Sequence, residues 1–326
     1  MTVFTRVRAV VVIWNSAPTL DRCLRHLLAT SWPDGVLEIV VVDNGSTDHS
    51  VDGWSARYPT IELRQTGANL GFGAGANRAL ADLDHLDGVA LVNPDAFVEP
   101  GWLPPLIAAL ENDDSLGAAC PKILFAQSDP AGLPIINNVG NEIDGRWEPR
   151  DRGYGELDHG QYDTTEEVWA WCGGAVLLRT DYVRSAGLFD ERLFLYCEDV
   201  DLSWRGRRKG WRYQYVPQSV VRHVHRASSG GVRTPLLDYL NRRNRLVVVS
   251  RHAGPRGTAI AWSRAMGGTA IAGLRLLLAV VRREPIRDGA DVSRRFRAAV
   301  DALRMLVGRP VKLPTALQPA SRGEGP

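Results

Sequence analysis

Short runs rich in valine, isoleucine and leucine alternate with helical patterns, and this alternation constrains the fold more than any other feature. Such runs lie at residues 8–13, 38–42 and 88–92. Between the first two, leucines and Cys23 recur at helical spacing over residues 20–28. Strands that alternate with helices predict a mostly parallel sheet covered by helices on both faces, which is an α/β fold.

The remaining pattern extends this plan through about residue 224. We expect further strands at 61–64, 117–125, 168–178, 211–216 and 220–224, and helices at 73–83, 102–110, 181–186 and 198–209. Pro121 predicts an edge strand or a bulge, because proline cannot donate to a sheet. Thr180 is expected to cap the helix that follows it. We expect residues 126–167 to form loops or short antiparallel strands that cover the functional site.

Charge divides the chain into two parts. Residues 1–235 carry 22 Lys+Arg against 31 Asp+Glu, whereas residues 236–326 carry 17 against 6. We therefore expect one domain over 1–235 and a basic helical region over 236–326, with a disordered tail after about 312. The basic region favours a polyanionic partner, either a phospholipid surface or nucleic acid.

Neither a disulfide framework nor a membrane span is predicted. The four cysteines form no C-x-x-C pair, which fits a reducing cytoplasm. The longest apolar window, residues 266–281, is interrupted by Arg275.

The segment Leu91–Val98 places a carboxylate where a buried strand ends. Asn93, Pro94 and Asp95 break the apolar run. Ligands of open α/β sheets bind at the carboxyl ends of the strands, and a hard cation there shares carboxylates with substrate phosphates. Asp95 is thus a candidate metal ligand at a nucleotide site, and a simple turn is the equal alternative.

Asp43 ends the second strand in the same way and could accept the imide N–H of a pyrimidine base. The alternative is a tight turn in which Ser46 or Thr47 caps a helix. A calcium loop beginning at Asp48 is excluded, because Pro59 stands where a glutamate is needed.

The glycine-rich segment from Asn69 to Asn77 does not have the dinucleotide-binding spacing. It reads G-x-G-x-G and follows the third strand rather than the first. Close backbone packing beside a ligand is the better interpretation.

Two further clusters could carry chemistry. Glu198, Asp199 and Asp201 begin a helix, and clustered carboxylates can provide a general base; acids placed favourably at a helix start are the alternative. His223 and His225 face one side of a strand, which suits a metal or phosphate ligand, although a lone histidine is more often structural.

Taken together, these motifs resemble the family 2 glycosyltransferases of the GT-A fold, and most of all the bacterial rhamnosyltransferases of cell-wall and O-antigen assembly. The resemblance spans about residues 8 to 231 and rests on the order V-V-I-W-N, D-N-G-S, N-L-G-F-G-A-G-A-N, N-P-D, C-G-G-A, F-D-E-R-L-F-L-Y-C-E-D-V-D-L-S-W-R and V-R-H-V-H.

The resemblance implies a role for each motif. Asp199 would be the catalytic base with Glu198 second, and Asp95 with His223 would hold Mg²⁺ or Mn²⁺ on the donor diphosphate. Donor-binding residues would be Asn15, Asp43, Asn69, Gly71, Asn77, Asn93 and Asp95, and acceptor-binding residues Trp171, Gly173 and Gly174. Asn93-Pro94-Asp95 leaves one carboxylate where many relatives have two or three, which puts tight metal dependence in doubt.

The expected function is inverting transfer of a sugar from a nucleoside diphosphate, dTDP- or UDP-linked, to a glycan or polyprenyl-diphosphate-linked acceptor. The donor most in keeping with the resemblance is dTDP-rhamnose. The alternative is a non-catalytic module for glycan or nucleic acid; few aromatics accompany the basic segment, which argues against nucleic acid.

The composition of the basic region predicts the location of the protein in the cell. Residues 259–281 and 296–307 suit helices that lie in an anionic membrane interface, which would place the protein on the cytoplasmic face of the plasma membrane. Packing on the catalytic domain or in a homodimer is the equal alternative.

Overall fold

The computed structural model describes residues 3–224, 234–282 and 289–311. The chain forms two compact units. The first comprises Met1–Glu142, Arg150–Phe194 and Glu198–Val232, and the second comprises Ile143–Pro149, Leu195–Cys197 and Arg233–Pro326. The second unit therefore includes two short segments that interrupt the sequence of the first.

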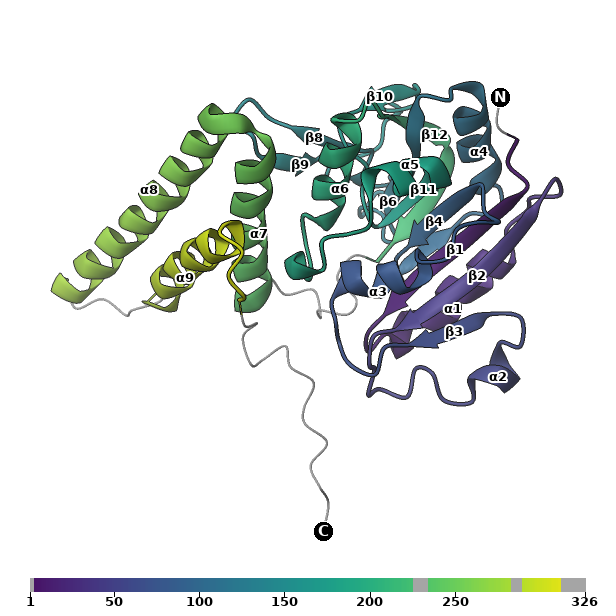
Figure 1. Cartoon of the computed structure of the whole chain (residues 1–326), viewed down its shortest axis with the longest axis horizontal. Helices are drawn as coiled ribbons and strands as arrows, with labels where there is room; N and C mark the ends of the chain where they lie inside the picture. Colours follow the sequence, from purple (N-terminus) through teal and green to yellow (C-terminus); the bar gives the residue numbers. More distant parts are fainter. Residues whose placement is uncertain (1–2, 225–233, 283–288, 312–326) are drawn as a thin grey trace, which may run out of the picture. The chain divides into compact units, whose positions relative to one another are not determined.

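A twisted central sheet organises the first unit (Figure 1). Its order is β10-β12-β6-β11-β4-β1-β2-β3, with β5 added to β12 and β7 to β6. The described strands are β1 (Arg6–Ile13), β2 (Val36–Asp43), β3 (Glu62–Gln65), β4 (Gly88–Val92), β5 (Ala96–Val98), β6 (Leu116–Phe125), β7 (Ile136–Asn138), β8 (Asn141–Ile143), β9 (Pro149–Asp151), β10 (Glu166–Val168), β11 (Ala175–Arg179) and β12 (Arg212–His223). Strands β1, β2, β3 and β4 pair in parallel, as do β6 and β12, whereas β11 is antiparallel to both neighbours. The predicted α/β class with a mostly parallel sheet is confirmed.

Helices cover both faces of this sheet. The described helices are α1 (Ala17–Leu28), α2 (Trp54–Arg57), α3 (Phe72–Ala79), α4 (Leu103–Asn112), α5 (Thr180–Ala186), the short 3₁₀ turn η1 (Glu191–Leu193), α6 (Glu198–Arg207), α7 (Pro235–His252), α8 (Gly254–Val281) and α9 (Gly289–Leu306). Alternate residues of β1 divide between two cores: Val11 packs in the core that contains α1 and α4, and Val10 in the core that contains α3 and α5. Burial on both faces explains why the strands are continuously apolar.

Several local expectations differ from the structure. Pro121 was expected to mark an edge strand or a bulge. Strand β6 lies between β12 and β11, so the edge alternative is wrong, whereas the bulge alternative agrees with the register shift between Val216 and Val220 of β12, opposite Pro121. Thr180 is the first helical residue and makes no cap, because Arg179 occupies the cap position.

Some predicted boundaries also shift. The two short strands expected over 211–224 are one strand, β12. The strand expected over 168–178 is divided, because Val168 ends β10, which pairs with β12, and Ala175–Arg179 form β11. Helix α3 ends at Ala79 rather than at residue 83.

Three helices, α7, α8 and α9, make up most of the second unit. Among the described residues, no helix combines the length and the hydropathy that crossing a bilayer requires. His225 and the tail expected to be disordered after 312 lie outside the described residues.

Candidate active site

The carboxyl ends of parallel strands bring the predicted polar residues to one edge of the sheet. Asp43 is the last residue of β2 and pairs with Ile13 at the end of β1, just before Asn15. Asp95 follows β4, and His223 ends β12. Since parallel strands end at the same edge, residues from distant motifs lie around one place.

Asp95 and His223 form a buried pair. His223 Nε2 lies 3.0 Å from Asp95 Oδ1, and the residues are 6% and 4% exposed. Strand pairing causes this contact, because His223 is opposite Ala96 in the antiparallel pair of β12 and β5. The second ring nitrogen, Nδ1, lies 3.1 Å from Asn137 Oδ1, which fixes the ring plane.

The pair fits a divalent cation. Carboxylate oxygen and imidazole nitrogen are both accepted by Mn²⁺. Adjacent ligands of an octahedral ion at about 2.1 Å lie about 3 Å apart, which matches the 3.0 Å between Nε2 and Oδ1. Within the described part of the chain no group of three His, Cys, Asp or Glu side chains gathers for a metal. The pair would therefore supply two ligands, and substrate phosphate and water the rest.

Glu198 and Asp199 begin α6 side by side. Gly173 N–H donates to Asp199 Oδ2 at 3.1 Å, and Val200 N–H donates to Oδ1 at 2.8 Å. Burial raises the pKa of both carboxyls, and the charge of Asp199 raises that of Glu198 further. Among the described residues Glu198 Oε2 is buried without a hydrogen-bond partner. A carboxylate with a raised pKa is suited to general-base work near neutral pH.

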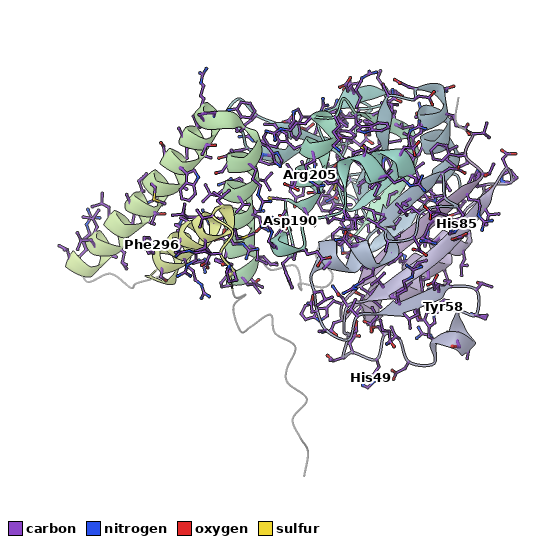
Figure 2. The ribbon with its side chains drawn as sticks, in the orientation of Figure 1. His49, Tyr58, His85, Asp190, Arg205 and Phe296 are labelled. Carbon is purple, nitrogen blue, oxygen red and sulfur yellow. The ribbon has the colours of Figure 1, made fainter. Side chains whose placement is uncertain are left out.

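Asp201, the third acid of this motif, has a structural role. It is 3% exposed at the side chain and pairs with Arg205 at 2.9 Å. Arg205, which Figure 2 labels, also donates to the backbone carbonyls of Ala186 and Leu188. The pair thus ties α6 to the end of α5.

Gly173 and Gly174 connect Asp199 with the segment that contains the Asp95–His223 pair. Gly173 holds Asp199 as described, and Gly174 O accepts from Asn93 N–H at 3.0 Å. An ideal Cβ on Gly174 would lie 3.6 Å from the His223 ring. Trp171, in contrast, is fully buried and donates to Tyr182 OH at 3.0 Å, so its side chain belongs to the core rather than to an acceptor surface.

Turn hydrogen bonds fix Asp43, at the end of β2, and Asn15, just after β1. Asp43 Oδ1 accepts from Ser46 N–H at 2.9 Å, and Oδ2 accepts from Gln65 Nε2 at 3.3 Å. Asn15 Oδ1 accepts from Thr47 N–H at 2.8 Å. The tight turn considered as the alternative is therefore present, and it also holds the Asp43 carboxylate in place.

The glycine-rich segment is organised by Asn44, which the sequence interpretation left out. Asn44 Nδ2 donates to Gly71 O at 2.8 Å, and Asn69 Oδ1 accepts from Gly71 N–H at 3.0 Å. Gly71 has φ +87°, and a Cβ there would lie 2.3 Å from Phe194 O. Close backbone packing explains this glycine, although the neighbour is another part of the chain.

Asn77 uses its amide inside the protein. Nδ2 donates to Phe189 O and to Glu191 Oε1, and Oδ1 accepts from Phe189 N–H. These bonds tie α3 to the segment before η1, so this side chain supports the fold rather than a ligand.

The sequence interpretation also left out Asp151. It ends β9, and burial raises its pKa; its charge adds to the effect of burial in raising the pKa of Asp199. It accepts from Asn138 Nδ2 at 2.8 Å. No sequence signal could have identified it, because it lies in an irregular stretch whose path depends on tertiary pairing.

Comparison with known proteins adds independent evidence. The sequence model described as "Glycosyl transferase family 2" matches residues 9–164. The N-acetylglucosaminyl-diphospho-decaprenol L-rhamnosyltransferase of Mycobacterium tuberculosis (strain H37Rv) is 33% identical over 277 residues, which cover 78% of this chain and 87% of the relative.

Two solved structures show the same fold. The mannosyltransferase PcManGT of Pyrobaculum calidifontis, in complex with GDP-Man and Mn²⁺, is 18% identical with a TM-score of 0.51, covering 93% of this chain and 88% of that one. GalNAc-T7 with UDP, GalNAc and Mn²⁺ is 17% identical with a TM-score of 0.60, covering 76% of this chain and 48% of that one. The chain therefore belongs to glycosyltransferase family 2, has the GT-A fold and is similar to the rhamnosyltransferases of that family.

Proposed function

We propose that this glycosyltransferase moves L-rhamnose from dTDP-rhamnose to a hydroxyl of a polyprenyl-diphosphate-linked sugar, with inversion at the anomeric carbon. The observation that carries the proposal is the Gly173-Gly174 bridge, which joins a carboxylate of raised pKa, Asp199, to the buried Asp95–His223 pair. The acceptor class is supported by the mycobacterial relative, whose name specifies a decaprenol-linked sugar.

The donor would lie along the carboxyl edge of the sheet. Asp43 would accept from the pyrimidine ring, with Asn15 beside it, and Asn69, Gly71 and Asn93 would line the path toward the diphosphate. Asp95 and His223 would hold Mg²⁺ or Mn²⁺, which when bound offsets negative charge on the leaving diphosphate. Support comes from the 3.0 Å spacing of the pair and from the Mn²⁺ named with two solved structures of this fold.

The acceptor chemistry would fall to Asp199. Its carboxylate would take the proton of the acceptor hydroxyl as that oxygen attacks the anomeric carbon, and the carbon–diphosphate bond breaks on the opposite face. Gly173 N–H and Val200 N–H hold the two carboxylate oxygens, so the base keeps one orientation during the attack. A single displacement of this kind inverts the anomeric centre.

A substrate panel tests the proposal. The protein is incubated with a polyprenyl-diphospho-N-acetylglucosamine acceptor and, in turn, dTDP-rhamnose, UDP-glucose, UDP-N-acetylglucosamine and GDP-mannose. We expect mass spectrometry to detect a deoxyhexose added only with dTDP-rhamnose, and NMR to show inverted anomeric configuration. Transfer of another sugar would contradict the donor assignment, and transfer only to a free glycan would contradict the acceptor assignment.

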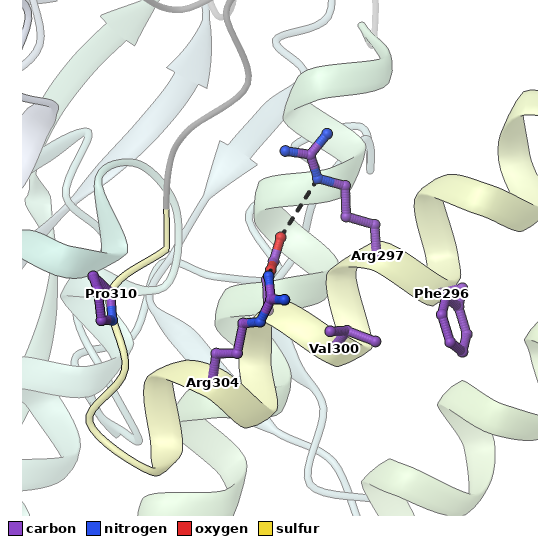
Figure 3. A pocket seen from close by; sticks show the side chains of 6 residues that line it. Phe296, Arg297, Val300, Arg304 and Pro310 are labelled. Atoms are coloured by element: carbon purple, nitrogen blue, oxygen red, sulfur yellow. Dashed lines mark hydrogen bonds and ion pairs between the residues drawn. The ribbon is translucent and has the colours of Figure 1, made fainter.

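We also propose that the second unit rests on an anionic membrane surface. Helix α8 exposes Ile271, Leu274 and Leu277 beside arginines. On α9, exposed Phe296 borders a pocket of about 460 Å³ whose lining includes Arg297 and Arg304 (Figures 2 and 3). Exposed apolar side chains among arginines suit the interface of an anionic leaflet. This arrangement would hold the enzyme next to a lipid-linked acceptor on the cytoplasmic face.

Vesicle sedimentation checks this proposal. The full chain is expected to sediment with anionic vesicles at low salt and to be released at high salt, because each basic residue near the leaflet contributes about 1 kcal/mol. Leu274→Glu with Leu277→Glu, at residues 56% and 59% exposed, is expected to weaken binding at least about tenfold. Leu28→Glu with Val36→Glu, both 51% exposed in the first unit, is the charge-matched control and is expected to bind nearly normally. Equal sedimentation of all three proteins would contradict the membrane assignment.

A further inference from the structure

The residues just before Glu198 adopt a backbone conformation that side chains disfavour. Phe194, Tyr196 and Cys197 have φ values of +66°, +73° and +66°. Phe194, with ψ −61°, has the dihedral angles of the strained γ-turn. Non-glycine residues in such conformations persist only where the surrounding structure enforces them, and they gather at functional sites.

Asn244 of α7 enforces part of this conformation. It is fully buried, and Nδ2 donates to two successive carbonyls, Leu195 O and Tyr196 O, both at 2.8 Å. These three residues belong to the same compact unit. On the other side, Phe194 O accepts from Phe72 N–H at 2.8 Å in the first unit. Three consecutive carbonyls are thus fixed, immediately before the chain enters α6.

The orientation of the Asn244 amide is set by its neighbour. Arg243 Nε donates to Asn244 Oδ1 at 2.8 Å, and a guanidinium can only donate. Both amide hydrogens therefore point to the two carbonyls. Arg243 is itself 1% exposed and lies over the Tyr239 ring, whose hydroxyl donates to Asp301 of α9 at 2.7 Å. A chain of buried contacts within the second unit therefore supports the Asn244 amide.

We propose that Asn244 is a positioning residue for the catalytic carboxylate, Asp199. By holding the carbonyls of Leu195 and Tyr196 it keeps the strained segment in the one conformation that delivers Glu198 and Asp199 to the start of α6. It touches no reacting atom, and its effect passes through the chain. The inference rests on the proposed function of Asp199.

The substitution that tests this role is Asn244→Asp. It keeps the size of the side chain and the acceptor for Arg243, but it removes both N–H donors and turns a carboxylate toward two carbonyls. We expect kcat to fall on the order of a hundredfold, the scale of a misplacement of about 1 Å, while donor affinity stays within about twofold. Asn241→Asp, the same change one turn earlier on α7, is the control and is expected to keep kcat. Asn244→Ala removes the donors without adding charge and is expected to behave as Asn244→Asp does.

A glycine rescue separates positioning from general folding. In the Asn244→Asp background, Cys197→Gly removes the side chain that opposes a positive φ, so kcat is expected to recover several-fold. Hydrogen exchange is the readout that needs no activity: amides of residues 194–200 are expected to exchange faster in Asn244→Asp than in Asn241→Asp.

The outcomes distinguish the two proposals. A normal kcat in Asn244→Asp, or unchanged exchange at residues 194–200, would overturn the role of Asn244 while leaving the proposed function intact. A wild-type protein that transfers no sugar would remove the proposed function, and full activity in Asp199→Asn would remove Asp199 as the base. In either case hydrogen exchange would decide alone whether Asn244 holds the segment.

Discussion

Asp199→Asn is expected to lower kcat by about a hundredfold or more, the usual contribution of a general base, while donor binding stays near normal. The amide keeps the size of the carboxylate and can still accept from Gly173 N–H, which donates at 3.1 Å in the wild type. It cannot take up the acceptor proton. Steady-state kinetics with saturating donor, together with donor affinity measured by thermal shift, separates loss of chemistry from loss of binding.

The pH dependence gives a second measure of the same role. Burial raises the pKa of Asp199, so the carboxylate takes up a proton at a higher pH than an ordinary aspartate, whose value is about 4. Activity in the wild type should therefore fall as the pH drops, with a midpoint above that value. Near-normal turnover of Asp199→Asn would rule out Asp199 as the base.

Glu198→Gln is the matched control. Glu198 is the more buried acid, with Oε2 unpartnered among the described residues, so it keeps its proton more readily than Asp199 does. Glutamine resembles that protonated form, and we expect most of the turnover and the acid limb to remain. A loss as large as that of Asp199→Asn would move the base to Glu198.

The sheet could be predicted because each of its central strands shows an apolar run in the sequence. Strands β1, β2 and β4 are buried on both faces, so each is a continuous apolar run that local sequence displays. For Pro121 the sequence left an edge strand and a bulge open. The register shift in β12 opposite Pro121 agrees with the bulge, because an interior strand can hold a residue that cannot donate only where the pairing is irregular. The Thr180 cap was wrong because the helix begins one residue earlier than the hydroxyl suggested.

The site was predictable only where residues end a strand. Asp43, Asp95 and His223 end or follow strand patterns. Parallel pairing places Asp43 beside the end of β1, and the antiparallel pairing of β12 with β5 brings His223 to Asp95. Asp151 lies in an irregular segment, and Asn244 donates to carbonyls 48 and 49 residues earlier in the chain, so neither could be placed from local sequence. Asn77 shows the opposite case: a polar residue in a glycine-rich motif whose amide is used wholly by the protein.

Asp95→Asn is expected to weaken binding of the nucleoside diphosphate donor in Mn²⁺ by at least about tenfold, about 1.4 kcal/mol, and to leave binding of the free nucleoside unchanged. Asparagine can still accept from His223, so the buried imidazole keeps a partner at the position now 3.0 Å away. What disappears is the negative charge that would hold the cation against the diphosphate. Calorimetry with the donor and with the nucleoside, each with and without Mn²⁺, measures both effects.

Asp43→Asn provides the contrasting control. Asp43 lies at the end of β2, and its proposed contact is to the base, so its loss should weaken donor and nucleoside equally and in a way that does not depend on Mn²⁺. If Asp95→Asn instead lowers both affinities equally, Asp95 serves only the turn between β4 and β5.

Because a single carboxylate and one imidazole hold the cation in the proposed site, most of its remaining ligands come from the donor and water. Metal affinity should therefore be weak in the free protein and strong only with the diphosphate present, and the Asp95→Asn variant should lose that coupling.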